Sequence, residues 1–215
     1  MSFNLELYGS EARRGAEPPL RICLDANVWV SYVAASAVLK RGTPADLVDM
    51  IDEGHARGIP LQLFLSWELI DTIQEVLRRL GVEFGLMTLF IAAIEGLMRS
   101  GPERLEPPLF LTGRDQLAMH DREDAGVLGS CFAHDVELLV TDNLVDFDTL
   151  DAERIDTQII TRGDGSTRQL FALVHEPIGH KPLAVMHPID ALEWLNNGQR
   201  PTADEVRTVY VSDTD

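Results

Sequence analysis

The side chains best suited to chemistry in this sequence are carboxylates in three clusters. Asp25 stands alone, Asp121 is followed by Asp124, and Asp142 is followed by Asp146. Crowded carboxylates repel one another, which raises the pKa of at least one of them unless a divalent cation neutralises their charge. Mg²⁺ and Mn²⁺ prefer oxygen ligands, and a pair of such ions can activate water and stabilise the leaving oxygen in phosphodiester cleavage. The clusters therefore predict a Mg²⁺ or Mn²⁺ site with hydrolytic chemistry.

The same carboxylates also have a structural interpretation. Asp25 or Asn27 would cap the helix that follows by accepting a hydrogen bond from its free N–H groups. Asp124 would complete a capping box with Asp121, which stands three residues earlier. The residues alone leave the catalytic and the structural interpretation open.

The elements around the clusters predict that the carboxylates meet at one edge of a sheet. Residues 22–24 are a short apolar run that ends at Asp25, and a helix-compatible segment follows it. Each of the other clusters also lies at a predicted strand end or helix start. In an open parallel sheet, ligands bind beyond the carboxyl ends of the strands. We therefore expect Asp25, Asp124 and Asp146 to lie close together.

Strands and helices alternate along the chain. The predicted strands cover 22–24, 60–65, 137–141 and 157–161, and the predicted helices cover 28–42, 43–58, 67–81, 84–99, a segment from 121, and 188–198. This order implies right-handed crossovers and a parallel sheet covered on both faces. A Gly-rich turn at 163–165 predicts a hairpin. The expected fold class is α/β, in three layers (α/β/α) around a central parallel sheet, with a C-terminal hairpin and helix elaboration.

The length of 215 residues predicts one domain with elaborations. The predicted parts are a flexible N-terminal arm at 1–19, the α/β domain at 20–160, a hairpin and helix packed on it at 161–200, and a mobile acidic tail at 201–215. No apolar run reaches the roughly 20 residues needed to cross a bilayer, and the N-terminal segment lacks an apolar signal core. We therefore expect a cytoplasmic protein without a membrane partner, in which Cys23 and Cys131 are buried thiols.

The charge balance bears on nucleic-acid binding. The chain has 18 Lys and Arg residues against 35 Asp and Glu residues, a net charge of −17. Such a charge repels a polyanion except where basic groups or metal cations reverse the local field. It argues against tight, unaided nucleic-acid binding, but it does not exclude a nuclease, because clustered metal-binding carboxylates contribute to the same imbalance.

Two predicted helices carry further expectations. The segment 84–98 is apolar nearly all round, which predicts that it packs on the sheet or on a partner chain, and we expect a homodimer formed through it with help from the first helix. Ser66 is the predicted cap of the helix 67–81, and a core stripe is predicted on that helix at Leu69, Ile73, Val76 and Leu80. Thr72 borders this stripe, and Glu68 and Glu75 lie just beyond it on the same side.

The motifs LDANVWVSY and DREDAGVLGSCFAHDVELLVTDNLVDF resemble the opening and closing halves of the PIN-domain family, over roughly residues 20–160. Members of that family are largely metal-dependent ribonucleases, and they include the toxins of many bacterial toxin–antitoxin pairs. The resemblance implies a PIN-like fold, RNA as substrate, and metal binding by Asp25 and Asp124. It also implies an antitoxin protein as a partner.

The chain departs from the family pattern at three places. Ala26 stands where the opening motif has Thr, and Thr72 stands where a helix Glu is usual, so that Glu68 or Glu75 would have to substitute. The common Thr-x-Asp becomes Thr-Asp-Asn at 141–143, a form that a subset of the family shares. This leaves Asp146 as the third metal ligand, with Asn143 as a polar group beside it.

The leading hypothesis is a Mg²⁺- or Mn²⁺-dependent endoribonuclease, with toxin activity as a further expectation. Its predicted catalytic residues are Asp25, Asp124, Asp146 and Asn143, the first three as metal ligands, and its less certain site residues are Asp121, Asp142, Glu68 and Glu75. The alternative is a non-catalytic PIN-like module that binds a protein partner or RNA. The missing helix Glu, Ala26 and the acidic charge favour that alternative.

Overall fold

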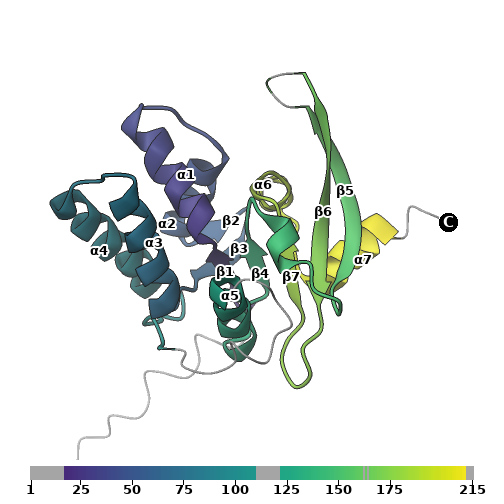
Figure 1. The fold of residues 1–215 in the computed structure, drawn as a ribbon. Coiled ribbons are helices and arrows are strands. Elements are labelled where there is room, and N and C mark those ends of the chain that lie inside the picture. The colour runs from purple at the N-terminus through teal and green to yellow at the C-terminus, as the bar shows by residue number, and fades with distance from the viewer. Residues whose placement is uncertain (1–16, 110–121, 162, 164, 212–215) are drawn as a thin grey trace, which may run out of the picture.

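The computed structural model describes residues 17–109, 122–161, 163 and 165–211, and these form an α/β fold around one sheet. The sheet has seven strands in the order β2-β3-β1-β4-β7-β6-β5 (Figure 1). The strands are β1 (Leu20–Leu24), β2 (His55–Ala56), β3 (Ile59–Leu63), β4 (Leu138–Val140), β5 (Glu153–Thr161), β6 (Thr167–His175) and β7 (Leu183–Met186). Strands β3, β1, β4 and β7 are parallel, while β2, β6 and β5 join antiparallel. The predicted fold class, with central parallel strands, is confirmed.

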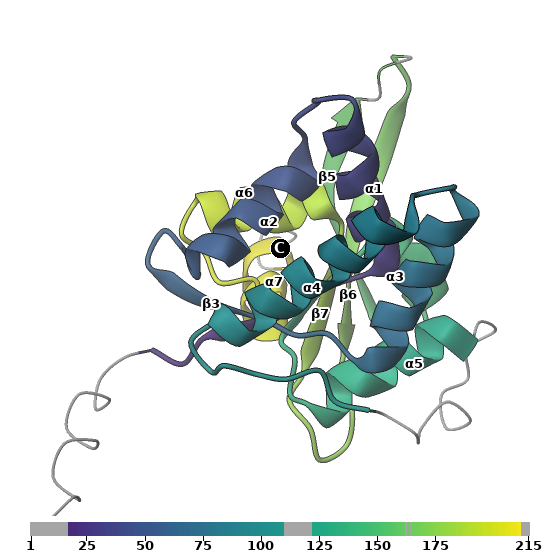
Figure 2. The same ribbon diagram turned by 90° about the vertical axis from the view of Figure 1, so that its left-hand side faces the viewer.

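Seven helices surround the sheet in the described part of the chain. They are α1 (Ala26–Ala37), α2 (Thr43–Glu53), α3 (Trp67–Arg79), α4 (Phe84–Ser100), α5 (Arg122–Ala133), α6 (Pro188–Asn196) and α7 (Ala203–Val211), and a 3₁₀ helix, η1 (Leu144–Phe147), follows β4. Helices α1 to α4 lie together at one side of the molecule, with α4 outermost (Figures 1 and 2). None of the helices in the described segments is long and apolar enough to cross a membrane.

The central strands are buried because both of their faces are apolar. Every residue of β4 and β7 is buried, and so is every residue of β1 except Arg21. Strands buried on both faces appear in a sequence as continuous Val, Ile and Leu runs rather than as alternating patterns. The predicted buried thiols, Cys23 and Cys131, are free cysteines in this core.

The orientation of α3 differs from the prediction. Ser66 caps the helix as expected, since its hydroxyl accepts a hydrogen bond from the backbone N–H of Leu69 at 3.3 Å. The buried face, however, consists of Leu69, Ile70, Ile73 and Leu77. Val76 lines a cavity and Leu80 is exposed, so the helix is turned slightly from the predicted stripe. A pattern of apolar residues leaves this choice open because Ile70 and Leu77 fit a helical face equally well.

Two strands differ from the sequence prediction. The predicted helix 43–58 ends at Glu53, and the short strand β2 (His55–Ala56) follows it. The other unpredicted strand is β7. Strand β7 pairs in parallel with β4, with Leu138 opposite Ala184 and Val140 opposite Met186. The sequence predicts no strand between the hairpin and the helix 188–198. A run of four apolar residues is too short for periodicity to assign it, and only the pairing with β4 makes it a strand.

The predicted mobile tail from residue 201 is wrong for residues 203–211, which form α7. This helix packs against β5, β6 and β7, and it buries Ala203 and Val206. Arg207 of α7 forms ion pairs with Glu153 of β5 at 2.6 Å and with Glu176, which follows β6. These pairs join the helix to the hairpin. The tail residues 212–215 and the predicted arm at 1–16 lie outside the described residues.

Strands β5 and β6 form the predicted hairpin, which extends past the end of the rest of the sheet (Figure 1). The pairing register shifts between Asp156 and Ile159. At this irregularity the buried carboxylate of Asp190, in the first turn of α6, accepts hydrogen bonds from Thr157 Oγ1 at 2.7 Å and Gln158 Nε2 at 2.6 Å. Helix α6 therefore fixes the base of the hairpin.

Candidate active site

Asp25 lies where β1 meets α1, at the carboxyl edge of the parallel strands. It is the N-cap of α1, and its Oδ1 accepts the backbone N–H of Ala26 at 2.7 Å. Its Oδ2 accepts two further hydrogen bonds, from Asn27 Nδ2 at 2.7 Å and from Thr141 Oγ1 at 2.8 Å. The carboxylate is buried, with 6% of its residue surface exposed. Asp25 is thus a helix cap, as the structural interpretation requires, and these contacts also hold it in one orientation.

Asn27 and Thr141 connect the ends of β1 and β4. Leu24 pairs with Val140, so Asp25 and Thr141 are neighbours although they are 116 residues apart in sequence. Asn27 Nδ2 donates to Thr141 Oγ1 at 2.9 Å, and Asn27 Oδ1 accepts the backbone N–H of Asp142 at 3.2 Å. Sequence reasoning did not assign either residue to the site. The available signal was that Thr141 ends a buried run just as Asp25 does.

The environment of Asp25 disfavours its negative charge. Burial raises its pKa above the ordinary value, and the negative charges of Asp142 and Asp146 raise it further. The hydrogen bonds from Thr141 and Ala26 act in the opposite direction. The result is a buried, oriented carboxylate among other carboxylates, an arrangement that a bound cation would stabilise.

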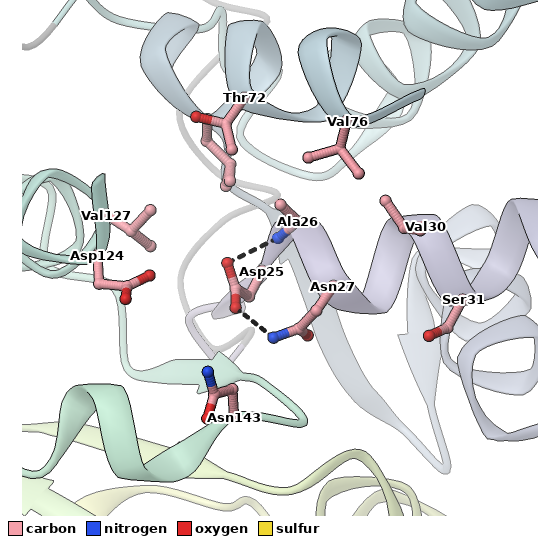
Figure 3. Close-up of a pocket in the computed structure, with 11 residues that line it drawn as sticks. Asp25, Ala26, Asn27, Val30, Ser31, Thr72, Val76, Asp124, Val127 and Asn143 are labelled. Carbon is pink, nitrogen blue, oxygen red and sulfur yellow. Dashed lines mark hydrogen bonds between the residues drawn. The ribbon is translucent and has the colours of Figure 1, made fainter. Parts of the chain in front are cut away.

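Asp25, Asp124 and Asn143 lie around one cavity of about 400 Å³ (Figure 3). Asp124 comes from the first turn of α5 and Asn143 from the loop after β4, and the remaining wall comes from α1, α3 and Val127 of α5. Figure 3 shows these three side chains at one end of the cavity, while Val30 and Val76 face each other farther along it. The fold therefore brings together residues from three distant parts of the chain.

The acidic residues after β4 are placed differently from Asn143. Neither Asp142 nor Asp146 lines the cavity. The side-chain amide of Asn143 donates a hydrogen bond to Asp146 in the first turn of η1, which connects Asp146 to the site through Asn143. Asp146 also contributes to the raised pKa of Asp25, so its charge acts at this edge of the sheet.

His187 belongs to the same edge, although no motif in the sequence singles it out. It follows β7 directly and caps α6, with its Nδ1 accepting the backbone N–H of Ile189 at 3.2 Å. Because Nδ1 is the acceptor, a neutral His187 carries its proton on Nε2, which lies 3.3 Å from Asp142 Oδ1. Burial lowers the pKa of His187, which favours this neutral form. Its place after a buried apolar run was the signal that could have revealed it.

The helix α3 contributes no carboxylate to the cavity wall. Thr72 lines the cavity, whereas Glu68 and Glu75 do not. Glu75 accepts hydrogen bonds from Arg78 and Arg79, each at 2.8 Å, and these arginines lower the pKa of Glu75 to about 2. Asp121, the remaining candidate, lies outside the described residues.

A family model described as PIN domain matches residues 21–144, which is more than half of the chain. The chain belongs to the PIN domain family. Membership indicates a nuclease-type function in general terms, and PIN domains generally use divalent metal ions. No curated protein and no solved structure shows a significant match to this PIN domain chain. Asp146, His187 and the hairpin lie beyond the matched residues.

The carboxylate oxygens of Asp25 and Asp124 in this PIN domain suit a weakly held divalent cation. An ionised carboxylate offers about four acceptor positions, and three hydrogen bonds occupy Asp25, which leaves room for one more partner. Among the residues that the structure describes, no three His, Cys, Asp or Glu side chains are grouped closely enough to hold a metal ion. Mg²⁺, however, usually keeps several waters and is bound through one or two carboxylates and substrate phosphates. Asp25 and Asp124 meet that smaller requirement.

Proposed function

We propose that this PIN domain is a Mg²⁺- or Mn²⁺-dependent endoribonuclease that cleaves RNA phosphodiester bonds. The observation that carries the proposal is the cavity in which Asp25 and Asp124 lie at one end, at the carboxyl edge of the parallel sheet. The family indicates nuclease-type chemistry, and the pairing of a buried carboxylate with a second one agrees with a cation site. RNA is the proposed substrate and Mg²⁺ or Mn²⁺ the proposed cofactor.

The chain's own residues would orient the reacting groups. Asp25 and Asp124 would hold the cation, which supplies an activated water and stabilises the leaving oxygen when bound. Asn27 and Thr141 fix Oδ2 of Asp25, so the carboxylate needs no reorientation when the cation binds. Asn143 lies at the cavity and holds Asp146 nearby through its side-chain amide.

Calorimetry with Mn²⁺ and an RNA cleavage assay test this proposal together. Asp25→Asn and Asp124→Asn should each weaken Mn²⁺ binding and cleavage by about 100-fold or more, because each removes one of two direct ligands. The matched control is Asp71→Asn, since Asp71 is exposed on α3 and does not line the cavity. Strong Mn²⁺-dependent cleavage that persists in Asp25→Asn would place the active site elsewhere.

A second candidate function is a non-catalytic module that binds RNA or a protein partner. The observation that favours it is that Ala26 and Thr72 line the cavity, so that this part of the wall offers no charge to a cation. The wild-type protein would then neither bind Mn²⁺ measurably nor cleave any RNA. That joint result would support the binding module and reject the nuclease.

We further propose that the nuclease is the toxin of a toxin–antitoxin pair and acts in the cytoplasm. This proposal rests on the resemblance of the acidic motifs to those of such toxins. Induced expression of the chain should arrest bacterial growth, and Asp25→Asn should relieve the arrest. An adjacent small gene whose product restores growth would identify the antitoxin, whereas unaffected growth on expression of soluble wild type would reject the toxin role.

A further inference from the structure

The candidate cavity extends well beyond the place where a cation would bind. Asp25, Asp124 and Asn143 occupy one end, and the other end runs between α1 and α3 (Figure 3). Val30 and Val76 line that far end. Hydrated cations and phosphates are disfavoured against apolar walls, because burial without partners costs free energy. The proposed cation would bind at the acidic end, and its binding does not explain the function of the apolar end.

The size of the cavity and the lining of its far end suit a flat, mostly apolar group with polar edges. The whole cavity, acidic end included, measures about 400 Å³, which is in the range of pockets that bind small organic groups. The hydroxyl-bearing residues Thr72 and Ser31 also line the cavity. A hydroxyl both donates and accepts hydrogen bonds, so it can pair with either kind of group on the edge of a ring. A nucleobase has this combination of apolar faces and polar edges.

The distribution of positive charge favours base binding over phosphate binding. Eight arginines in the described part of the chain already pair with Asp or Glu side chains. The net charge of −17 repels the backbone of a nucleic acid. Affinity from phosphate contacts grows with the number of lysines and arginines that neutralise phosphates, and no described lysine or arginine lines the cavity. Burial of a base in an apolar cavity does not depend on this charge.

We propose that the apolar end between Val30 and Val76 binds one unpaired nucleobase of the RNA, with the adjoining phosphate at Asp25 and Asp124. The inference rests on the proposed nuclease function for the position of that phosphate. A base within a duplex is stacked and paired, and extruding it costs a few kcal/mol. The site consequently selects RNA that is single-stranded at the point of binding.

Fluorescence of 2-aminopurine placed in a short single-stranded RNA measures base burial directly. The full-length protein is titrated into the RNA with Ca²⁺ in place of Mg²⁺ or Mn²⁺, so that binding is measured without cleavage. A gel checks that the strand is recovered intact. Three strands are compared, namely the labelled single strand, its duplex, and an abasic strand of the same length whose affinity is measured by competition with the labelled strand. The single strand should bind at least about tenfold more tightly than the other two, as expected when burial of one base is lost. Equal binding of all three would overturn the proposal.

Variants of the cavity wall test the location. Val76→Phe should fill the apolar end and weaken binding of the single strand at least about tenfold. Val209→Phe, on the distant helix α7, is the matched control and should leave binding unchanged. Val30→Phe fills the same space from α1, so a folding defect in one variant does not remove the test. Unchanged RNA binding by folded Val76→Phe and Val30→Phe would leave the cavity to another occupant, such as an apolar peptide side chain.

Mn²⁺ calorimetry separates this inference from the proposed function. Val76→Phe keeps both carboxylates, so Mn²⁺ binding should match wild type while base binding is lost. Base-dependent binding without any Mn²⁺ binding or cleavage would support the cavity as a base site and reject the nuclease. Cleavage that is equally fast on single strands and duplexes, with no effect of Val76→Phe, would support the nuclease and reject the base site.

Discussion

At the scale of single residues, Asp25 combines a structural and a chemical role. It caps α1 through Ala26 and is fixed by Asn27 and Thr141, yet burial and neighbouring carboxylates make its charge unfavourable. Unfavourable charge of this kind is common at functional sites, where the rest of the scaffold offsets its cost. The two interpretations that the sequence left open are therefore compatible for this residue.

A histidine outside the site predicts how stability depends on pH. His175 on β6 is buried, its Nε2 has no hydrogen-bond partner in the described structure, and burial lowers its pKa to about 4. The unfolded chain, with an ordinary histidine pKa of 6.5, binds this proton more readily than the folded chain. The contribution of neutral His175 to the free energy of unfolding is therefore complete above pH 6.5, and it is lost as the pH falls towards 4. Its full size is about 3 kcal/mol.

Urea unfolding of wild type and His175→Asn over this pH range measures the effect. The difference in free energy of unfolding between the two proteins should shrink by about 3 kcal/mol as the pH falls. Asp25 and Asp190 have raised pKa values, so they act in the opposite direction, but they are present in both proteins and cancel. His55→Asn, at an exposed position, is the control. A difference that is constant with pH would contradict the prediction.

At the scale of elements, α3 determines how strongly a cation can be held. Its Thr72 lines the cavity, while Glu75 is engaged with Arg78 and Arg79. A carboxylate at position 72 would add a third direct ligand to Asp25 and Asp124. We therefore expect Thr72→Glu to strengthen Mn²⁺ binding by about tenfold or more, and to increase RNA cleavage.

Calorimetry of Thr72→Glu checks this, with Glu75→Gln as its counterpart. Glu75→Gln should leave Mn²⁺ affinity unchanged, because this side chain does not line the cavity. The substitution Thr72→Gln controls for side-chain size without adding charge. Weaker Mn²⁺ binding by Thr72→Glu, or a large loss in Glu75→Gln, would show that α3 presents a different face to the cation.

At the scale of the whole molecule, α4 leaves an apolar surface uncovered. It buries Met87, Ile91, Ile94 and Met98 towards the core, but its Phe84 and Leu89 are 76% and 69% exposed. Val38 and Leu39, after the end of α1, are also exposed. Beside them lies a groove of about 530 Å³ between α1, α3 and α4, and Figure 2 shows α4 at the outside of the molecule. Exposed apolar patches of this kind usually mark association.

We expect this surface to form a homodimer. Light scattering at micromolar concentration should give twice the mass of the 23.9 kDa chain, and Leu89→Glu should shift the mass to that of the monomer. Like-charged copies repel, so added salt should favour the dimer. Ile178→Glu, at a fully exposed position elsewhere, should have no effect. A monomeric wild type under these conditions would contradict the prediction.

The sequence by itself determined the elements whose signals are local. The apolar run before Asp25, the Ser66 cap of α3 and the Gly-rich turn of the hairpin each involve neighbouring residues, so composition and spacing were enough to predict them. The edge of the sheet at which Asp25 and Asp124 lie also followed, because the carboxyl ends of parallel strands share one edge.

Only the tertiary structure decided which residues surround Asp25. Thr141 reaches Asp25, and His187 reaches Asp142 at the same edge, because β1, β4 and β7 pair in register, and such pairing joins residues too far apart for any local pattern to record. The turn of α3 that presents Thr72, and the packing of α7 on the hairpin, depend in the same way on the surfaces that receive them. Local patterns specify an element and its apolar face within one residue or so, whereas burial against a particular partner selects the final orientation.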